Sequence, residues 1–183
     1  MKLKFLMGAL ALWMVLMMGM TLAVSAAAPE DSRVTLSMEG AKAIALKDAK
    51  ILEADAFFTK LNLDDDDRRE EYEVEFIADG KEYEYEIDAA SGDILESSVD
   101  RLDGKEGQVD FSAFLTLEQA AEKALAEARL AAADVKMVKM EFDFDDGRAE
   151  CEVEFESSNE FYRYKLDAKS GEILSYRKRR ISR

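Results

Sequence analysis

Glutamates at alternate positions are the residues of this chain whose type and spacing could perform chemistry. The six residues are Glu71, Glu73, Glu75, Glu82, Glu84 and Glu86. Paired carboxylates act as general acid and base in glycoside hydrolysis, provided that a pocket raises the pKa of one of them. Alternation places all six on one solvated face of a sheet, so we predict a partner-binding surface rather than a catalytic pair.

Runs of aspartate form a second candidate for chemistry, because calcium prefers oxygen ligands. They occur at residues 64–67 and at Asp143, Asp145 and Asp146. An EF-hand loop also needs a central glycine, a closing glutamate at its twelfth position and a helix on each side, and neither run has this context. We predict acidic hairpin turns with at most weak calcium binding, no dedicated metal site and no cofactor.

The residues that most enzymes use are largely absent from this chain. It has no histidine and a single cysteine, Cys151. These two facts exclude histidine-based triads, the usual His and Cys zinc sites and a disulfide within the chain. We predict a protein that is not an enzyme, in which Cys151 is a small buried side chain; a reactive thiol is the alternative.

The elements that must position these residues occur twice. Residues 36–97 align with residues 115–176 at a constant offset of 79 positions, and 26 of the 62 aligned pairs are identical. This period exceeds the roughly 20 to 50 residues of solenoid repeats, so we predict two small sibling domains that pack on each other. We define repeat 1 as residues 34–98, the linker as residues 99–114 and repeat 2 as residues 115–177.

Each repeat begins with the pattern of an amphipathic helix. Ser37 and Thr116 are suited to cap the two helix N-termini, and Thr116 with Gln119 completes a capping box. Apolar residues follow at helical spacing, and many are alanines, which allow close packing on a sheet.

Alternating apolar and charged residues come next and predict strands, with a hairpin turn at Asp79 and Gly80. The predicted inward residues include Tyr72, Val74, Phe76, Tyr83, Tyr85, Ile87, Val138, Met140, Phe142, Phe144, Val153, Phe155, Tyr162, Tyr164 and Leu166. The tyrosines fit a core better than a ligand-stacking platform, because they alternate with charged residues. A short last strand follows at Ile94 and Leu95, or at Ile173 and Leu174.

The predicted fold class is therefore α+β, with two tandem repeats, each one helix packed on an antiparallel sheet of about four strands. In repeat 2, Arg163 and Lys165 replace Glu84 and Glu86, so only repeat 1 keeps a wholly acidic ladder. Facing like charges destabilise a sheet unless water or a cationic partner relieves them. A single merged architecture, or carboxylates converging in a closed cavity, would contradict this picture of a passive docking module.

The charge of the chain limits its partners. It has 40 acidic against 25 basic residues and a net charge of −15. Such a chain repels phosphate, so we predict no nucleic acid partner. Residues 178–183 form a basic tail that could contact anionic lipid, wall polymer or an acidic protein, or could be a solvated chain end.

The first residues have the pattern of a targeting segment. Lys2 and Lys4 precede an apolar run at residues 5–24 and small residues before Pro29. Residues 1–28 are therefore a predicted signal peptide or, because about 20 apolar residues can span a bilayer, an uncleaved anchor. In both cases the repeats face the outside of the membrane, which the protein would contact only through this segment.

Both repeats resemble the PepSY domain family. The resemblance rests on a helix reading EQAAEKALAEA, on YEVEF and CEVEF, and on YEYEIDAASGDIL and YRYKLDAKSGEIL. It implies a non-catalytic domain of secreted or membrane-anchored bacterial proteins, associated with inhibition or regulation of peptidases. The family usually has a glycine near the end of its helix, where this chain has Lys50 and Arg129, so we expect a looser helix exit.

These observations predict a secreted or envelope-anchored, non-enzymatic module that binds an extracellular or envelope protein, with peptidase inhibition or regulation as the leading function. The acidic ladder of repeat 1 or an exposed edge strand would dock on the partner. The alternative is a structural or sensing module of the cell envelope that binds cations or wall polymer.

Overall fold

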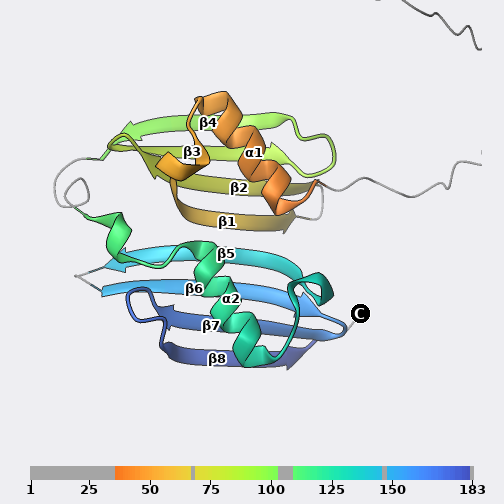
Figure 1. Ribbon diagram of the computed structural model, residues 1–183. Coiled ribbons are helices and arrows are strands. Elements are labelled where there is room, and N and C mark those ends of the chain that lie inside the picture. The colour runs from red at the N-terminus through yellow and green to blue at the C-terminus, as the bar shows by residue number, and fades with distance from the viewer. Residues whose placement is uncertain (1–35, 67–68, 103–108, 146–147, 182–183) are drawn as a thin grey trace, which may run out of the picture. The chain divides into compact units, whose positions relative to one another are not determined.

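The computed structural model describes residues 36–66, 69–102, 109–145 and 148–181 (Figure 1). Residues 33–183 belong to one compact unit. The predicted leader, the middle of the linker and parts of both aspartate runs lie outside the described residues.

Each repeat consists of one α-helix and four antiparallel strands, as predicted. The elements of the first half are α1 (Met38–Ala49), β1 (Phe57–Asp66), β2 (Arg69–Ala78), β3 (Lys81–Asp88) and β4 (Ile94–Arg101). Those of the second half are α2 (Leu117–Ala128), β5 (Lys136–Asp145), β6 (Arg148–Ser157), β7 (Glu160–Asp167) and β8 (Ile173–Arg180). Short 3-10 helices occur at η1 (Glu53–Asp55), η3 (Phe111–Ala113) and η4 (Ala132–Asp134).

The two four-stranded layers join edge to edge into one eight-stranded antiparallel sheet of order β4-β3-β2-β1-β5-β6-β7-β8. The sequence predicts that the repeats touch, but as separate sheets, so this merged sheet is a correction. Each repeat nevertheless keeps its own helix and its own four-stranded layer, so the merging concerns the sheet and not the unit that is repeated. The physical reason for the merging is that β1 and β5 are each the first strand of a layer, with unpaired backbone groups along one edge. Pairing these edges satisfies the groups on both strands at once.

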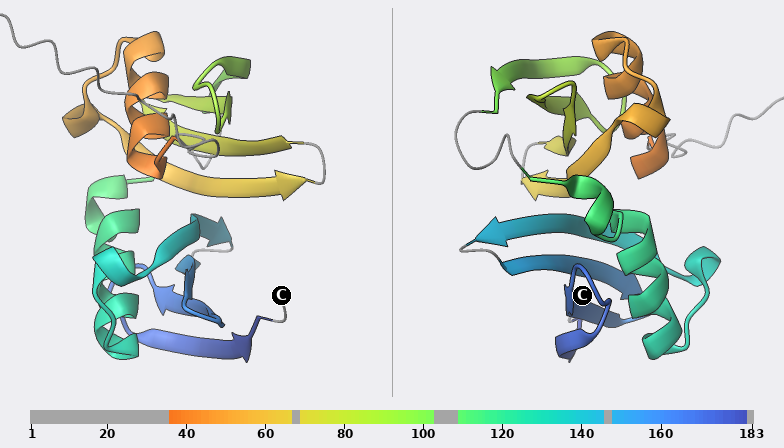
Figure 2. Two further views of the ribbon diagram at one scale, coloured as in Figure 1. Left: turned by 90° about the vertical axis from the view of Figure 1, so that its right-hand side faces the viewer. Right: turned by 60° about the vertical axis from the view of Figure 1, so that its left-hand side comes forward.

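The junction of β1 and β5 relates the two repeats by an approximate twofold axis. Leu61 pairs with Met140, and these residues lie 79 positions apart, which is the offset of the repeat itself. An axis through this pair, perpendicular to the sheet, keeps equivalent elements on the same face. Accordingly α1 and α2 cover one face, here called the helical face, and leave the other open (Figures 1 and 2).

The core lies between the helices and the sheet and contains most of the predicted inward residues. Phe76 and Phe155 are fully buried, and each stacks on two tyrosines of the next strand. The tyrosines are therefore core residues, as predicted. Cys151 is buried as well, and this burial raises the pKa of its thiol to about 12, which keeps it protonated and unreactive.

A β-bulge in β5 changes which residues of this strand face the core, so the prediction for Val138 is wrong. The register shifts between Met137 and Lys139, so Met137, rather than Val138, faces Phe155 and packs against the core. An extra residue in one strand reverses the alternation on one side of it, which a strict period of two does not anticipate. Phe144, also predicted to point inward, is 39% exposed at the far end of the strand.

The N-terminal caps of both helices agree with the sequence prediction, whereas their C-terminal ends differ from it. Ser37 accepts a hydrogen bond from the Gly40 N–H, and Thr116 forms the predicted capping box with Gln119. Lys50 and Arg129 adopt left-handed conformations with φ of 61° and 58° and keep backbone hydrogen bonds to the preceding turn. The helix exit is therefore closed, not loose, although a residue with a side chain occupies a conformation that glycine favours.

The last strand of each repeat is longer than predicted, because β4 continues to Arg101 and β8 to Arg180. Residues 178–180 of the predicted basic tail therefore belong to an edge strand. The ends of the linker pack on the sheet: the Phe111 ring lies 4.9 Å from that of Phe57, and the Phe114 ring lies 5.2 Å from that of Phe142.

Candidate functional site

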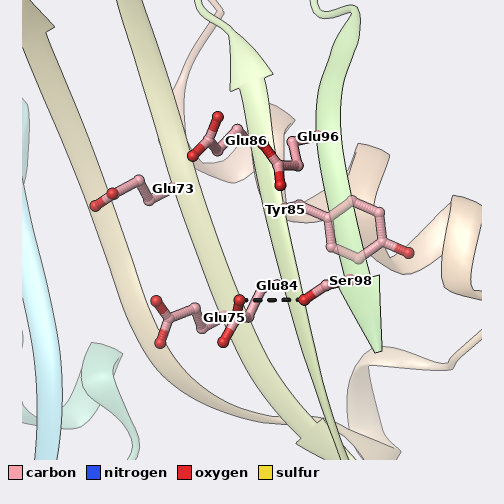
Figure 3. A pocket seen from close by; sticks show the side chains of 7 residues that line it. All are labelled: Glu73, Glu75, Glu84, Tyr85, Glu86, Glu96 and Ser98. Carbon is pink, nitrogen blue, oxygen red and sulfur yellow. Dashed lines mark hydrogen bonds between the residues drawn. The ribbon is translucent and has the colours of Figure 1, made fainter. Parts of the chain in front are cut away.

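The open face of repeat 1 carries the predicted glutamates on β2 and β3, opposite the buried tyrosines. Figure 3 shows four of them, Glu73, Glu75, Glu84 and Glu86, together with Glu96 and Ser98 of β4. The strand register explains the arrangement, since Glu73 pairs with Glu86 and Glu75 pairs with Glu84. Carboxylates therefore face each other across the β2–β3 pair, which is unfavourable unless another charge intervenes.

Strand β4 extends both rows of this surface. Glu86 pairs with Glu96, and Glu84 pairs with Ser98, whose hydroxyl donates a hydrogen bond of 3.1 Å to Glu84. The six side chains and the backbone around Tyr85 surround a shallow hollow of about 140 Å³. The Tyr85 hydroxyl itself bonds Asp48 of α1, on the helical face. We call this surface, Glu73, Glu75, Glu84, Glu86, Glu96 and Ser98, the acidic hollow.

A single lysine from β1 partly neutralises the acidic hollow. The Lys60 ammonium lies 3.1 Å from a Glu73 oxygen and 3.3 Å from a Glu75 oxygen. Asn62 also donates a hydrogen bond of 2.8 Å to Glu73. These contacts serve the β2 side of the hollow, whereas Glu86 and Glu96 form no ion pair with a described residue.

The acid–base properties follow this uneven distribution of cations. Burial and then the charges of Glu71, Glu96 and Glu73 raise the pKa of Glu86. Burial also raises the pKa of Glu75, although Lys60 opposes it. Burial acts to raise the pKa of Glu73 too, but hydrogen bonds from Asn62 and Lys60 outweigh it and lower the value. On a face that the sequence predicts to be solvated, the pKa values of Glu75 and Glu86 are therefore raised and that of Glu73 is lowered.

Two of the six predicted glutamates lie outside the hollow. Glu71 is held by Arg69 at 2.9 Å. Glu82 lines a neighbouring hollow with Thr59, Ile77 and the linker residue Phe111. Conversely, the sequence prediction missed Glu96 and Ser98, because it ended the last strand at Leu95. The alternation of Glu96, Ser98 and Asp100 is the signal that could have extended it.

Repeat 2 has the same backbone here and a different charge pattern. Arg163 forms ion pairs with Glu154 and Glu152, and the Lys165 ammonium lies 3.5 Å from Glu152. Lys139, the counterpart of Lys60, lies 2.6 Å from Glu141 and 3.4 Å from Glu152. Glu141, Glu152 and Glu154, at the centre of this surface, thus each have a cation within 4 Å. The predicted asymmetry of the two faces is therefore present in the structure.

The residues described form no group of three or more acidic, His or Cys side chains that could hold a metal ion. No helix among them is long and apolar enough to cross a membrane. The acidic hollow is open at the protein surface and lined by five carboxylates, so the chemistry it offers is attraction for cations.

The comparison with known families agrees with the repeated fold. The family model described as "Peptidase propeptide and YPEB domain", PepSY, matches residues 35–97 and again residues 115–177. The chain belongs to the PepSY family. This membership supports a regulatory or binding module, and it accounts for the shared helix and four strands of the two repeats.

Individual relatives add little about function. An uncharacterized protein of Streptococcus pyogenes serotype M6 is 46% identical over 72 residues, which are 39% of this chain and 55% of that protein. The chain thus spans about half the length of this curated relative.

Two solved structures are also similar. One is a protein of Clostridium difficile 630 described as a proposed lipoprotein, with 25% identity, a TM-score of 0.43 and coverage of 82% of this chain and 97% of that one. The other is the YpeB C-terminal domain of Bacillus megaterium, with 17% identity, a TM-score of 0.33 and coverage of 78% and 62%. Both TM-scores lie below 0.5, so neither likeness adds to the case for a function.

Proposed function

We propose that this chain is an extracytoplasmic, non-enzymatic module that binds a peptidase and regulates it through the acidic hollow of repeat 1. The observation that carries the proposal is the difference between the two open faces. Of the five glutamates of the hollow, only Glu73 and Glu75 form an ion pair with a described residue, and both do so with Lys60. Three cations, Lys139, Arg163 and Lys165, neutralise the equivalent surface of repeat 2. A surface that retains unfavourable charge in the free protein gains stability when a cationic partner covers it.

The position of the hollow suits a protein partner. It adjoins β4, which is an edge strand of the sheet and, among the strands that the structure describes, pairs only with β3. A partner segment that added a strand to β4 would bring its side chains close to Glu84, Glu86 and Glu96. Strand pairing would supply affinity, and basic side chains over the hollow would supply specificity. Bound across an active-site cleft, the sheet would block access of substrate.

The test uses the charge pattern of repeat 2 as its variant. Glu84→Arg with Glu86→Lys places on repeat 1 the cations that neutralise repeat 2, and the fold already accommodates that pattern. The wild-type protein and this variant are used to capture partners from the extracellular fraction of the source bacterium. We expect the wild type to retain a peptidase whose activity falls when the protein is added, and the variant to lose at least about tenfold in affinity.

A matched control changes charge elsewhere by the same amount. Glu127→Arg with Glu172→Lys alters exposed residues of repeat 2, neither of which lines the hollow, and should leave capture unchanged. Equal capture by the variant with a neutralised hollow would show that this surface is not the binding site. Recovery of a partner without peptidase activity would refute the regulatory role.

The alternative, an envelope module that binds anionic polymer, is favoured by one feature. Strand β8 presents four basic residues, Arg177, Lys178, Arg179 and Arg180, along the other edge of the sheet. Retention of wall polymer alone, abolished by changing these four residues to Gln, would favour this function over peptidase regulation.

A further inference from the structure

The approximate twofold axis relates two spaces between the helices, and only one of them is filled by the protein itself. The filled space lies on the α1 side and contains Lys42 and Phe58. The open space lies on the α2 side and is an apolar groove of about 430 Å³. Its lining includes Met38, Glu39, Glu122, Leu125, Met137 and Met140.

Lys42 shows how the filled space is occupied. Its side chain is only 3% exposed, although it carries a charge. Its ammonium lies 2.6 Å from Glu118, 3.3 Å from Glu53 and 3.4 Å from Glu39, and 4.7 Å from the centre of the Phe58 ring. Although burial opposes ionisation, these carboxylates raise the pKa of Lys42, so it stays charged. A cation on an apolar stem therefore fits between the two helices.

The groove is open because the equivalent positions carry other residues. Ala121 stands 79 positions after Lys42, and Met137 stands 79 positions after Phe58. Exchanging a lysine for an alanine and an aromatic ring for a thioether removes volume from the same framework. The linker supplies Phe111 and Phe114 beside the filled space, whereas the residues at the equivalent sequence positions, Ser32 and Thr35, have no ring.

The rim of the groove retains acidic groups. Glu39, Glu118 and Glu122 line it, against a single lining cation, Lys136. Among described residues, Glu122 has no ion-pair partner, and Glu39 has only Lys42, at 3.4 Å. The floor is apolar and consists largely of Leu125, Met137 and Met140. The groove thus has an acidic rim and an apolar floor, as the filled space has, but it lacks the lysine, and Ala132 stands where the filled space has Glu53.

From this geometry we infer that the groove is a second binding site, which takes a lysine or arginine side chain of another protein together with an adjoining apolar side chain. The stem lies on Ala121 and Met137, the cationic head reaches Glu39 and Glu122, and the apolar neighbour fills the floor. This site is on the helical face, so it is separate from the acidic hollow and acts whether or not the hollow binds a peptidase.

The simplest probe is a molecule with the chemistry of a lysine side chain. Hexylammonium, 1-hexanol and hexanoate have the same alkyl chain with positive, neutral and negative heads. The full chain is labelled at its methionine methyl groups, and binding is followed by NMR. Of nine methionines, Met38, Met137 and Met140 are the three that follow residue 20, and all three line the groove. They are assigned by single Met→Leu changes.

We expect hexylammonium to shift the signals of the three groove methionines and to bind about threefold or more tightly than hexanol, the effect of an exposed ion pair. Hexanoate should bind more weakly than both. Glu39→Gln with Glu122→Gln should abolish the preference for hexylammonium over hexanol, whereas Glu127→Gln, on α2 outside the groove, should not. Equal binding of the three probes would overturn the inference.

A filling variant tests the same idea without removing a stabilising group. Ala121→Lys restores the lysine found at the equivalent position of α1 and should prevent the hexylammonium shifts. Ala126→Lys adds the same side chain to an exposed position of α2 and should leave them intact. The hexapeptide Gly-Ser-Lys-Leu-Ser-Gly should compete with hexylammonium, and its counterpart with Glu in place of Lys should not.

Two results would assign the groove to a different occupant and overturn the inference. Groove signals that respond to hexylammonium only after removal of the residues before Leu36 would identify the chain's own N-terminal segment as the occupant. Groove signals that shift on dilution, without any probe, would identify a second copy of the chain.

Discussion

Repeats 1 and 2 share a backbone and 26 identical residues in 62, yet their surfaces differ in charge and in filling. On the open face, repeat 1 keeps clustered glutamates while repeat 2 neutralises them with Arg163, Lys165 and Lys139. On the helical face, Lys42 fills the space beside α1 while Ala121 leaves an open groove beside α2. The two repeats thus share the same core, whereas their open faces differ in charge and their helical faces differ in filling. Each repeat is therefore an internal control for the other.

The largest expected effect tests whether the shared core is equivalent in both halves. Phe76 and Phe155 are fully buried and equivalent, and each stacks on two tyrosines. We expect Phe76→Ala and Phe155→Ala each to lower the free energy of unfolding by about 3–5 kcal/mol, because each leaves a large cavity. Urea unfolding followed by circular dichroism measures both.

Because the sheet is continuous, the wild type and both variants should each unfold in one cooperative transition. Two separate transitions, of which only the mutated half shifts, would show that the repeats unfold independently. A difference of more than about 1 kcal/mol between the variants would show that the two cores are not equivalent.

The next effect sharpens the comparison of the open faces. Glu84→Arg with Glu86→Lys should stabilise the protein by roughly 0.5–2 kcal/mol, because each new cation faces a glutamate across β2 and β3. Arg163→Glu with Lys165→Glu should destabilise it by a similar amount. Urea unfolding at low and at high salt tests the cause, since screening should shrink both effects. A change that persists in high salt would point to packing instead.

A smaller effect should be the same in both repeats, because it concerns a shared backbone feature. Lys50 and Arg129 have positive φ, where a side chain is strained. Lys50→Gly and Arg129→Gly should each stabilise the protein by about 0.5–1 kcal/mol, which thermal unfolding can detect. Lys47→Gly, at an exposed position inside α1, is the control and should destabilise. If Lys50→Gly also destabilised, relief of backbone strain would not be what decides stability at this position.

The smallest effect is a difference in the pH dependence of stability. Burial and neighbouring carboxylates raise the pKa of Glu86 in the folded protein. Burial acts to raise the pKa of Glu152, but Arg163, Lys139 and Lys165 outweigh it and lower the value. The folded state therefore binds a proton on Glu86 more readily, and one on Glu152 less readily, than the unfolded state does.

The two groups should consequently give opposite slopes. Relative to Glu86→Gln, the wild type should lose stability as the pH rises from the ordinary glutamate pKa through the raised value. Relative to Glu152→Gln, it should have extra stability above the ordinary pKa and lose it as the pH falls through the lowered value. Urea unfolding between about pH 3 and 7 measures both, and slopes of the same sign would contradict the assigned directions.

Local patterns were enough to predict most of the secondary structure. Ser37 and Thr116 cap helices, Asp79 and Gly80 make a hairpin, and the alternating tyrosines are buried, because each depends on neighbours within a few residues. The bulges before Lys60 and Lys139 and the full length of β4 could not be predicted in this way. A bulge and the end of a strand depend on the partner strand, which lies elsewhere in the sequence.

The candidate site likewise has a part that local sequence patterns predicted and a part that they could not. Alternation placed Glu73, Glu75, Glu84 and Glu86 on one face, but it could not show that Lys60 of β1 reaches Glu73 and Glu75 or that Glu96 of β4 completes the hollow. These contacts join strands whose lateral order the sequence does not state. The raised pKa values of Glu75 and Glu86 follow from that lateral packing and not from the alternation.

The sequence by itself determined that this is a duplicated helix-and-strand unit without the residues for histidine-based catalysis or for the usual His and Cys zinc sites. It also determined that only the first copy keeps an uninterrupted acidic ladder, because composition and short-range periodicity carry that information. The tertiary structure alone decided that β1 and β5 pair into one sheet. It also decided that this pairing sets α1 beside α2, with Lys42 bonded to Glu118 on one side of the axis and an open groove on the other. Contacts between residues 76 or 79 positions apart arise from the packing of edges and faces, which a linear pattern does not encode.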